Sequence, residues 1–505
     1  MNIFLERMML SIPGFRIIII LLAFFIFGWL LFTYRILDVP PSINGDEAAI
    51  GYNAVLVART GHDSNGRFLP LFTAAEDSKD WKQPITFYSE VLAFRLFGPS
   101  YFVLRAVSVF LVLLSGSIIF LLVYELFGLK AAICSLLIFA TTPIIMIQSH
   151  LALENIAPVP FIAFWLWMIV KYNKNAKNKY LVLAATSLGC SIYSYLGLRL
   201  IVLPLIILTI AFVYFLNRKS PKMVIHQVLI FLILISVFPL MLLVVKNQYP
   251  GSALGLYRAY KVTSYQQILL PFISAFDPSF LFLQGDTTPY HSTGKQGMFL
   301  LASLPLFALG LAKILQKRQP ILVVIAISFF LMPILFGLAS DIHRASRLLS
   351  LIPSYAVISS VGMITLVSVR NKFWRSIFVF AMILVILLNF ADFIKDYWYE
   401  YPTRVKSDFS KPYQLVFEEA HNLSKSDNLV PFIQKDLRMQ NPLAEDFFEQ
   451  IYFPAGLKLW DENSPLPENS VVMVPDYILL KRKDVTQQRL GDNSEFGILI
   501  NKIKK

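Results

Sequence analysis

Long apolar runs separated by short polar connections occupy the chain from its N-terminal region to residue 391. Runs of about 16–24 apolar residues can cross the hydrocarbon core of a bilayer as helices. This pattern predicts a mostly α-helical, polytopic membrane bundle. We predict eleven membrane-spanning helices, at Ile17–Thr33, Tyr101–Val123, Ala131–Ser149, Ile156–Val170, Tyr180–Leu198, Leu200–Asn217, Gln227–Val245, Gln296–Ala312, Pro320–Ser340, Leu348–Val369 and Ser376–Ala391.

The charges between the predicted spans give the orientation. If the N-terminus is cytoplasmic, every inner connection is basic, as the positive-inside rule requires. The inner basic residues are Lys130, Lys171, Lys174, Lys177, Lys179, Arg218, Lys219, Lys222, Lys313, Lys317, Arg318, Arg370, Lys372 and Arg375. Counting the short apolar run Pro84–Phe97 as a span would invert everything after it, so we interpret it as an amphipathic helix in the outer interface. We therefore expect a multi-pass plasma-membrane protein with a cytoplasmic N-terminus.

Three outer regions are too long to be simple turns. They are residues 34–100, residues 246–295 and a C-terminal segment, 392–505. In the first, Asn44 can cap a short helix that opens with Asp46 and Glu47 and runs to Gly61. The C-terminal segment has an amphipathic helix pattern and strand-like runs, so we predict two domains: a transmembrane domain, 1–391, and a small extracytoplasmic α/β domain, 392–505. The helix is expected at Tyr413–Leu423 and the strands at Asn428–Ile433, Ser470–Val474 and Phe496–Ile500.

The composition of the 505-residue chain supports a membrane protein. It is 56% hydrophobic, and its mean hydropathy of +0.61 excludes a soluble globular protein. The formal net charge of +13 needs no nucleic-acid partner, because basic residues between spans account for it. Cys134 and Cys190 both lie inside apolar segments, so we expect no structural disulfide.

The unusual polar residues share the outer side of the predicted topology. Ionisable residues at the edge of a span are functional candidates by default. Cations or a divalent metal can neutralise a leaving lipid phosphate, while a carboxylate accepts a proton or holds the metal. The set therefore suits transfer of a group from a lipid phosphate. Its members are Asp46, Glu47, Asp80, Lys82, Glu154, Asp286, His291, His343, Arg344 and Arg347.

Structural explanations remain open for several of these residues. Asn44 and Glu47 have the spacing of a capping box, and carboxylates in a first turn suit the helix dipole. Lys82 is also explained by snorkelling at the interface. Glu154 could be an ordinary acid at a helix start.

Several short motifs resemble the GT-C membrane glycosyltransferases of the protein O-mannosyltransferase and aminoarabinose transferase type, which are glycosyltransferase family 39-like. The resemblance covers roughly residues 15–395 and rests on the order and spacing of the motifs together. The motifs are Asp46-Glu47-Ala48, Lys82-Gln83-Pro84-Ile85, Leu96-Phe97-Gly98, Leu104-Arg105, the run from Gly285 to Gly297, and His343…Arg347…Pro353.

The resemblance implies roles for the candidate residues. Asp46, with Glu47 beside it, would be the catalytic carboxylate, and Asp46 and Glu154 would be the ligands of a possible divalent metal ion. Lys82, Arg347, Arg344 and His343 would bind the donor phosphate, and Asp286 and His291 would belong to a substrate loop. Two positions depart from the family pattern: Glu154 replaces an Asp, and Gln83 replaces the first Pro of a Lys-Pro-Pro-Leu run.

The resemblance implies an inverting glycosyltransferase that moves a hexose or pentose from a polyprenyl-phosphate donor to a lipid, glycan or protein acceptor outside the cytoplasm. Its partners would be the donor, the acceptor and membrane lipids, with no nucleic acid. One alternative is a transporter or flippase of lipid-linked sugars, which should carry ionisable residues within spans and often has inverted repeats. Another is a non-catalytic scaffold, which would give no reason for the acidic pair at Asp46 and Glu47.

Overall fold

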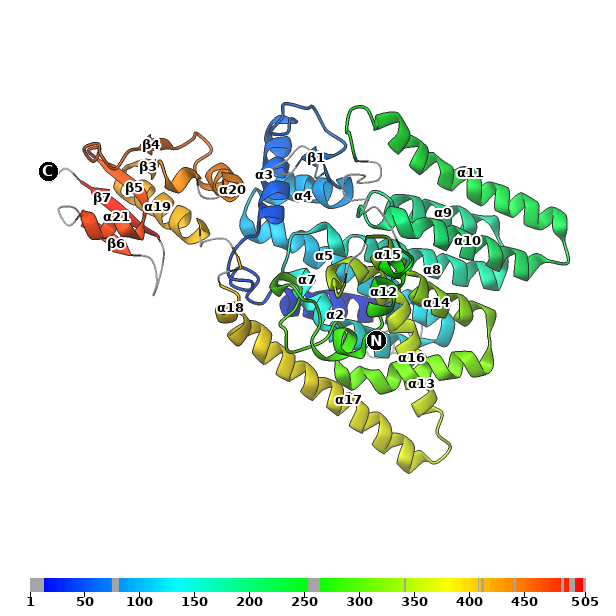
Figure 1. The fold of residues 1–505 in the computed structure, drawn as a ribbon. Helices are drawn as coiled ribbons and strands as arrows, with labels where there is room; N and C mark the ends of the chain where they lie inside the picture. Colours follow the sequence, from blue (N-terminus) through cyan, green and yellow to red (C-terminus); the bar gives the residue numbers. More distant parts are fainter. Residues whose placement is uncertain are drawn as a thin grey trace, which may run out of the picture. The chain divides into compact units, whose positions relative to one another are not determined.

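The computed structural model describes residues 13–74, 81–252, 264–339, 342–406, 408–409, 413–439, 442–482, 486–489 and 496–502. The chain folds as two compact units. Unit 1 comprises Met1–Ile36, Lys79–Thr86 and Arg105–Glu400, and unit 2 comprises Leu37–Ser78, Phe87–Leu104 and Tyr401–Lys505. Each unit is described by itself (Figure 1). The domain boundary predicted between residues 391 and 392 stays a prediction.

Unit 1 is built from helices, most of which are apolar along their whole length. Those that lie in it wholly or mostly are α2 (Pro13–Thr33), α5 (Tyr101–Phe127), α6 (Leu129–Ala140), α7 (Pro143–Ser149), α8 (Pro158–Asn175), α9 (Asn178–Ser191), α10 (Leu198–Asn217), α11 (Pro221–Val245), α12 (Gln266–Ser274), α13 (Leu304–Lys317), α14 (Pro320–Leu331), α15 (Ile334–Ala339), α16 (Ile352–Val367) and α17 (Lys372–Lys395). Short helical turns connect them: η1 (Glu154–Ile156), η3 (Ser279–Leu283), η4 (Pro289–His291), η5 (Leu301–Ser303), η6 (Ala345–Leu351) and η7 (Asp396–Glu400).

Among the described residues, nine helices are long and apolar enough to cross a membrane, or ten if the pair α6 and α7, bent by 63°, forms one span. Two predicted spans differ. The run predicted at Tyr180–Leu198 is helical only as α9, and that at Gln296–Ala312 becomes α13, each of 14 residues. The stretch Gln266–Leu283 was expected to lie in an outer loop, but it is long and apolar enough to cross a membrane. The predicted polytopic helix bundle is confirmed.

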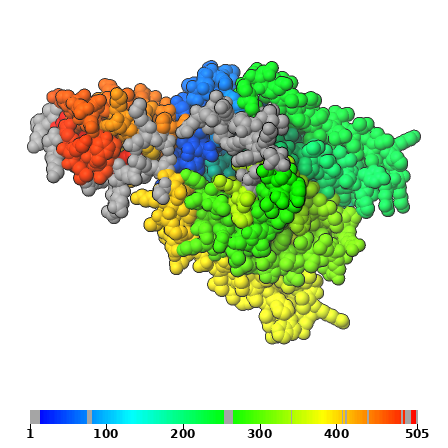
Figure 2. Space-filling model, in the orientation of Figure 1, coloured from blue at the N-terminus to red at the C-terminus, as the bar shows by residue number. Residues whose placement is uncertain are grey.

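Several candidate spans expose apolar side chains on the surface of unit 1. In α2 and in α17, only 11% of the most apolar 18-residue stretch is buried, and in α11 only 17%. The yellow surface in Figure 2 belongs to α17, whose exposed residues include Phe380 and Leu388. Such a surface suits contact with lipid tails, because a helix that is apolar all round is stable only when its outer face is also in an apolar medium.

Helices α13 and α16 touch through their backbones. A Cβ atom added at Gly310 would lie 1.8 Å from the carbonyl oxygen of Ile358, and one added at Gly362 would lie 1.9 Å from that of Leu306. Small residues at such crossings allow the close approach on which helix packing in membranes depends. Any side chain at either glycine would separate the two helices.

The C-terminal part of unit 2 contains a five-stranded sheet. Its strand order is β4 (Lys458–Trp460), β3 (Val430–Gln434), β5 (Ser470–Pro475), β7 (Phe496–Asn501), β6 (Thr486–Arg489). Strand β3 runs parallel to β4 and β5, whereas β7 runs antiparallel to β5 and β6. Helices α19 (Tyr413–Asp427), α20 (Pro442–Tyr452) and α21 (Asp476–Lys481) accompany the strands, with the short turns α18 (Tyr401–Arg404) and η8 (Leu437–Met439). The predicted α/β fold of this segment is confirmed.

The N-terminal part of unit 2 packs on that C-terminal part. It contains α3 (Gly45–Thr60), most of α4 (Pro84–Phe97) and the short strand β1 (Thr73–Ala74). Helix α20 packs along α3, where a Cβ atom at Gly51 would come within 2.7 Å of the fully buried Phe447 ring. Arg59 Nη1 donates to Gln450 Oε1 over 3.1 Å at the other end of this contact. The parts of the first outer region and of the C-terminal segment that belong to unit 2 therefore form one packed body.

Candidate functional site

The segment from Trp81 to Gln83 is a short extended stretch of unit 1 that begins with strand β2 (Trp81–Lys82) and leads into α4 at Pro84. Trp81 Nε1 donates to the carbonyl oxygen of Pro250 over 2.8 Å, and the N–H of Ile85 donates to that of Tyr193 over 3.3 Å. Successive side chains of an extended segment point to opposite faces. Lys82, only 6% exposed, therefore takes the face opposite to Trp81 and Gln83.

Gln83 is the centre of a set of polar contacts. Its backbone N–H donates to a carboxylate oxygen of Glu154, at the start of η1. Its side-chain Oε1 accepts a hydrogen bond of 2.5 Å from Arg199 Nη2, and its Nε2 donates to the carbonyl oxygen of Trp81 over 2.9 Å. Gln83 is fully buried, so these bonds replace the water that its polar atoms lose.

Arg199 was not among the predicted site residues. It lies at the start of α10, where Nε donates to the carbonyl oxygen of Ile192 over 3.2 Å and Nη1 donates to that of Ser252. With Gln83, the guanidinium thus holds three separate segments. The available sequence signal was an arginine at the edge of an apolar span on the predicted outer side.

Asp286 connects two sequence motifs that are far apart in the chain. Its Oδ1 accepts hydrogen bonds from Thr288 N (2.8 Å) and Thr288 Oγ1 (2.6 Å), and its Oδ2 accepts one of 2.5 Å from the N–H of Ala345, the first residue of η6. The N–H of Thr287 also donates to the carbonyl oxygen of His343 over 3.2 Å. The run that begins at Gly285 is therefore bonded directly to the turn that carries the predicted phosphate-binding residues.

The turn consists of His343 and Arg344, which lead into η6, and the first residues of η6, which include Arg347. His343 has a left-handed backbone conformation (φ +53°), its Nε2 lies 3.2 Å from Asp277 Oδ2, and its ring stacks on Phe280 at 5.1 Å. The N–H of Arg347 donates to the carbonyl oxygen of Arg344 over 3.1 Å, and both arginines are partly exposed. His343 thus fixes the turn, while the two arginines reach the surface of unit 1.

The contacts of Gln83 and those of Asp286 belong to one region of unit 1. Turn η1, which begins with Glu154, packs against η6, which carries Arg347, and α7 packs against both turns. Lys82, Glu154, Asp286, His343 and Arg347 are thereby placed on neighbouring segments. We define this region as the candidate site.

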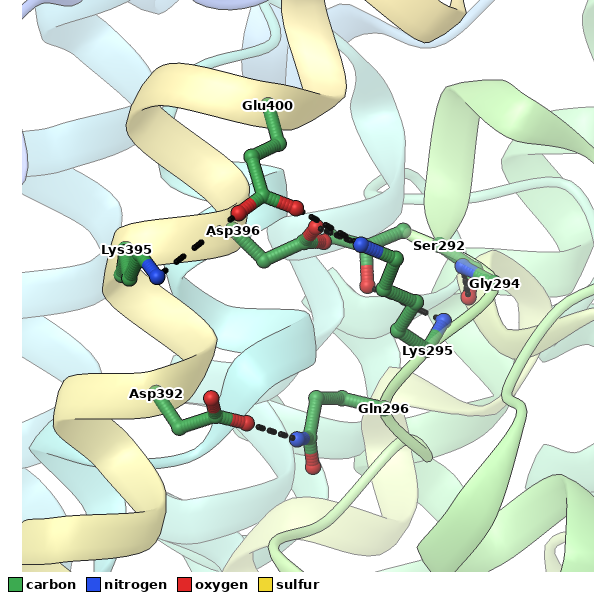
Figure 3. A network of polar contacts seen from close by, with 9 residues as sticks. Ser292, Gly294, Lys295, Gln296, Asp392, Lys395, Asp396 and Glu400 are labelled. Atoms are coloured by element: carbon green, nitrogen blue, oxygen red, sulfur yellow. Dashed lines mark hydrogen bonds and ion pairs between the residues drawn. The ribbon is translucent and has the colours of Figure 1, made fainter.

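The loop from Gly285 to Gln296 is held at two further points. Gln148 Nε2, at the end of α7, donates to His291 Nδ1 over 2.9 Å. At the other end of the loop, Lys295 Nζ lies 2.9 Å from Asp396 Oδ1 and 2.7 Å from Glu400 Oε2, and Gln296 Nε2 donates to Asp392 Oδ2 over 3.2 Å. Figure 3 shows Lys295 pointing at the two carboxylates of η7. The loop is therefore fixed on α7, η6 and the end of α17.

Asp46 and Glu47 lie in unit 2, in the first turn of α3, where the structure gives them different environments. Glu47 is fully buried and completes a capping box: the N–H of Asn44 donates to Glu47 Oε2 over 3.1 Å, and the N–H of Glu47 donates to Asn44 Oδ1 over 2.9 Å. Asp46 is exposed. The predicted catalytic roles of both residues stay predictions.

The metal hypothesis finds no support in the residues present. Within the described ranges, no group of three or more His, Cys, Asp or Glu side chains could hold a metal ion. One carboxylate oxygen of Glu154, the proposed second ligand, accepts the hydrogen bond from Gln83, and Asp80 lies outside the described residues. We therefore derive no chemical step through a metal.

Comparisons with known proteins concern the fold. The family model described as dolichyl-phosphate-mannose-protein mannosyltransferase matches residues 82–242. The crystal structure of ArnT from Cupriavidus metallidurans bound to undecaprenyl phosphate is similar over 97% of this chain and 98% of that chain, with 12% sequence identity and a TM-score of 0.53. Its apo state is similar over 95% and 97%, with the same identity and score. No match was found among curated proteins. The predicted GT-C fold is confirmed.

Proposed function

We propose that this chain, a multi-pass membrane protein with the GT-C fold, is a glycosyltransferase that takes a sugar from a polyprenyl-phosphate donor. The observation that supports this most is the packing of the Lys82 segment, η1 and the Arg347 turn in one region of unit 1. The matched family is named for a dolichyl-phosphate donor, and the ArnT crystal structure contains undecaprenyl phosphate. Both point to a polyprenyl phosphate as the carrier.

In the proposed reaction, the cations stabilise the departing phosphate. Lys82 supplies a point charge and Arg347 can bind two phosphate oxygens at once, with Arg344 and His343 on the same turn. Asp46 accepts the proton of an acceptor hydroxyl. The acceptor oxygen bonds to the anomeric carbon as the carbon–oxygen bond to phosphate breaks, and that electron pair leaves with the phosphate. A single displacement of this kind inverts the anomeric centre.

The acceptor in this proposal is a lipid, a glycan or a protein, and the reaction takes place outside the cytoplasm. The orientation in this proposal is the one predicted from the basic inner connections, with the N-terminus inside and the C-terminal domain outside. Asp286 and His291 belong to the loop that borders the substrate, and the contacts of Asp286 with η6 support a part in shaping that loop.

A turnover assay on the purified full-length protein tests the proposal. A panel of polyprenyl-phosphate-linked hexoses and pentoses is supplied, and release of polyprenyl phosphate is measured. We expect turnover of one donor, reduced roughly ten- to hundredfold in Lys82→Ala through loss of a charge-assisted contact. Glu125→Gln is the matched control, because Glu125 pairs with Lys171 and Lys174 at 3.0 and 2.8 Å. Equal turnover in wild type and Lys82→Ala would contradict the proposal.

A further inference from the structure

The two positions at which this chain departs from the family motif are bonded to each other. Gln83 stands where the motif has a proline, and Glu154 stands where it has an aspartate. The backbone N–H of Gln83 donates to the Glu154 carboxylate, a bond that a proline could not make because it has no N–H. The Gln83 side chain adds the 2.5 Å bond to Arg199, which a proline also lacks. The departures therefore form one local arrangement.

This arrangement acts on the backbone on both sides of Lys82. Trp81 is fixed to Pro250 at 2.8 Å, Gln83 to Glu154 and Arg199, and Ile85 to Tyr193. Trp81 and Gln83 flank Lys82 in the extended stretch, and Ile85 lies in the first turn of α4 that follows it. These contacts therefore fix the backbone from which the Lys82 side chain projects. Lys82 itself is buried, so the position of its backbone limits where its ammonium group can reach.

We propose that Glu154, Gln83 and Arg199 form a positioning arm for Lys82, in which the Glu154 carboxylate serves as a hydrogen-bond acceptor for the Gln83 N–H and binds no metal. The proposal rests on the proposed function, in which Lys82 binds the donor phosphate. Arg199 suits this role because its planar guanidinium holds Gln83, Ile192 and Ser252 together in a fixed geometry. None of the three touches the reacting atoms.

The first experiment compares two substitutions of Glu154 by the affinity of the full-length protein for undecaprenyl phosphate in detergent. Glu154→Gln keeps an acceptor oxygen of similar reach but loses the charge, whereas Glu154→Ala loses both. We expect affinity within about threefold of wild type for Glu154→Gln and about tenfold weaker for Glu154→Ala, since only the latter leaves a buried N–H without its acceptor. Glu125→Gln is again the control and should bind as wild type does.

The second experiment measures the rate at which an amine-reactive reagent labels Lys82, read by mass spectrometry without any donor. Gln83→Pro removes the N–H and the side-chain amide, so labelling should rise severalfold, as it should in Glu154→Ala, while Glu154→Gln and Glu125→Gln stay at the wild-type rate. Gln83→Met keeps the N–H and loses only the Arg199 contact, which provides a milder variant if Gln83→Pro does not fold. Gln83→Met and Arg199→Gln should be non-additive when combined.

The outcomes separate this proposal from the function on which it rests. If Glu154→Gln weakens binding as much as Glu154→Ala, the carboxylate charge itself is needed, and the arm is wrong while the proposed function stands. If Lys82 labelling is the same in all variants, the arm is wrong as well. If wild type does not bind undecaprenyl phosphate, or Lys82→Ala binds as well as wild type, the proposed function fails.

Discussion

The first turn of α3 holds two adjacent carboxylates whose roles can be separated by substitution. Glu47 is fully buried, and its Oε2 accepts the N–H of Asn44, which is itself only 8% exposed. Glu47→Ala leaves that N–H without its acceptor and removes half of the capping box, at a cost of about 1–2 kcal/mol. Glu47→Gln retains an oxygen that can complete the box, so it should cost little. Asp46→Asn alters an exposed side chain of the same volume.

A local opening that costs about 1.4 kcal/mol less is about tenfold more populated, and amide hydrogen exchange reports that population. We therefore expect the N–H of Ala48, which donates to the carbonyl oxygen of Asn44 over 3.0 Å, to exchange about tenfold faster in Glu47→Ala. It should exchange at the wild-type rate in Glu47→Gln and in Asp46→Asn.

Donor turnover is then measured on the same preparations. Asp46→Asn should abolish it, because the amide cannot accept the acceptor's proton, and Glu47→Gln should retain it. Loss of turnover in Glu47→Gln with normal exchange at Ala48 would refute this reasoning and give Glu47 a catalytic charge. Near-normal turnover in Asp46→Asn would leave Asp46 as a residue of the helix start only.

Three further predictions concern other parts of the chain. Lys82→Ala and Arg347→Ala should each lower kcat/KM roughly ten- to hundredfold and be non-additive when combined, if both bind one phosphate. Gly51→Ala should destabilise unit 2 by about 1–3 kcal/mol, because its Cβ would lie 2.7 Å from the Phe447 ring, and Phe447→Ala by about 3–5 kcal/mol through the cavity it leaves; pulse proteolysis measures both, and wild-type midpoints would contradict them. Burial, with repulsion from a nearby lysine, lowers the pKa of His421 below 6.5. The unfolded chain therefore binds the proton first, so stability should fall as pH drops from 6.5 towards the lowered pKa, and His421→Gln should remove that part of the slope.

Local signals in the sequence predicted local structure well. Asn44 and Gly61 were expected to bound a short helix, and α3 is capped by these two residues, with Gly61 at φ +79°. Strands β3, β5 and β7 follow the predicted apolar runs. Strands β4 and β6 were missed because they are short edge strands: β4 has only three residues, and β6 has no apolar residue. The strands they pair with, rather than their own sequence, specify them.

Contacts between distant residues could not be predicted. Gln83 and Arg199 are 116 residues apart, and no spacing rule connects an arginine at a span edge with a glutamine in an outer loop. The stretch Gln266–Leu283 was expected to lie in the outer region 246–295, and Pro271 and Asp277 interrupt its apolar pattern. Two of the sequence motifs do lie together in the structure. The hydrogen bond from the N–H of Ala345 to Asp286 joins the run that begins at Gly285 to the run that begins at His343.

The loop from Gly285 to Gln296 has a thermodynamic consequence for ligand binding. Its anchors on η6, on α7 through His291 and on η7 through Lys295 are all contacts within the protein. A flexible loop would lose conformational entropy when a ligand ordered it, and that loss would weaken the observed affinity. Here the ordering has already taken place during folding. Calorimetry of phosphate-lipid binding should therefore show a small entropic penalty, and most of the contact free energy should be realised as affinity.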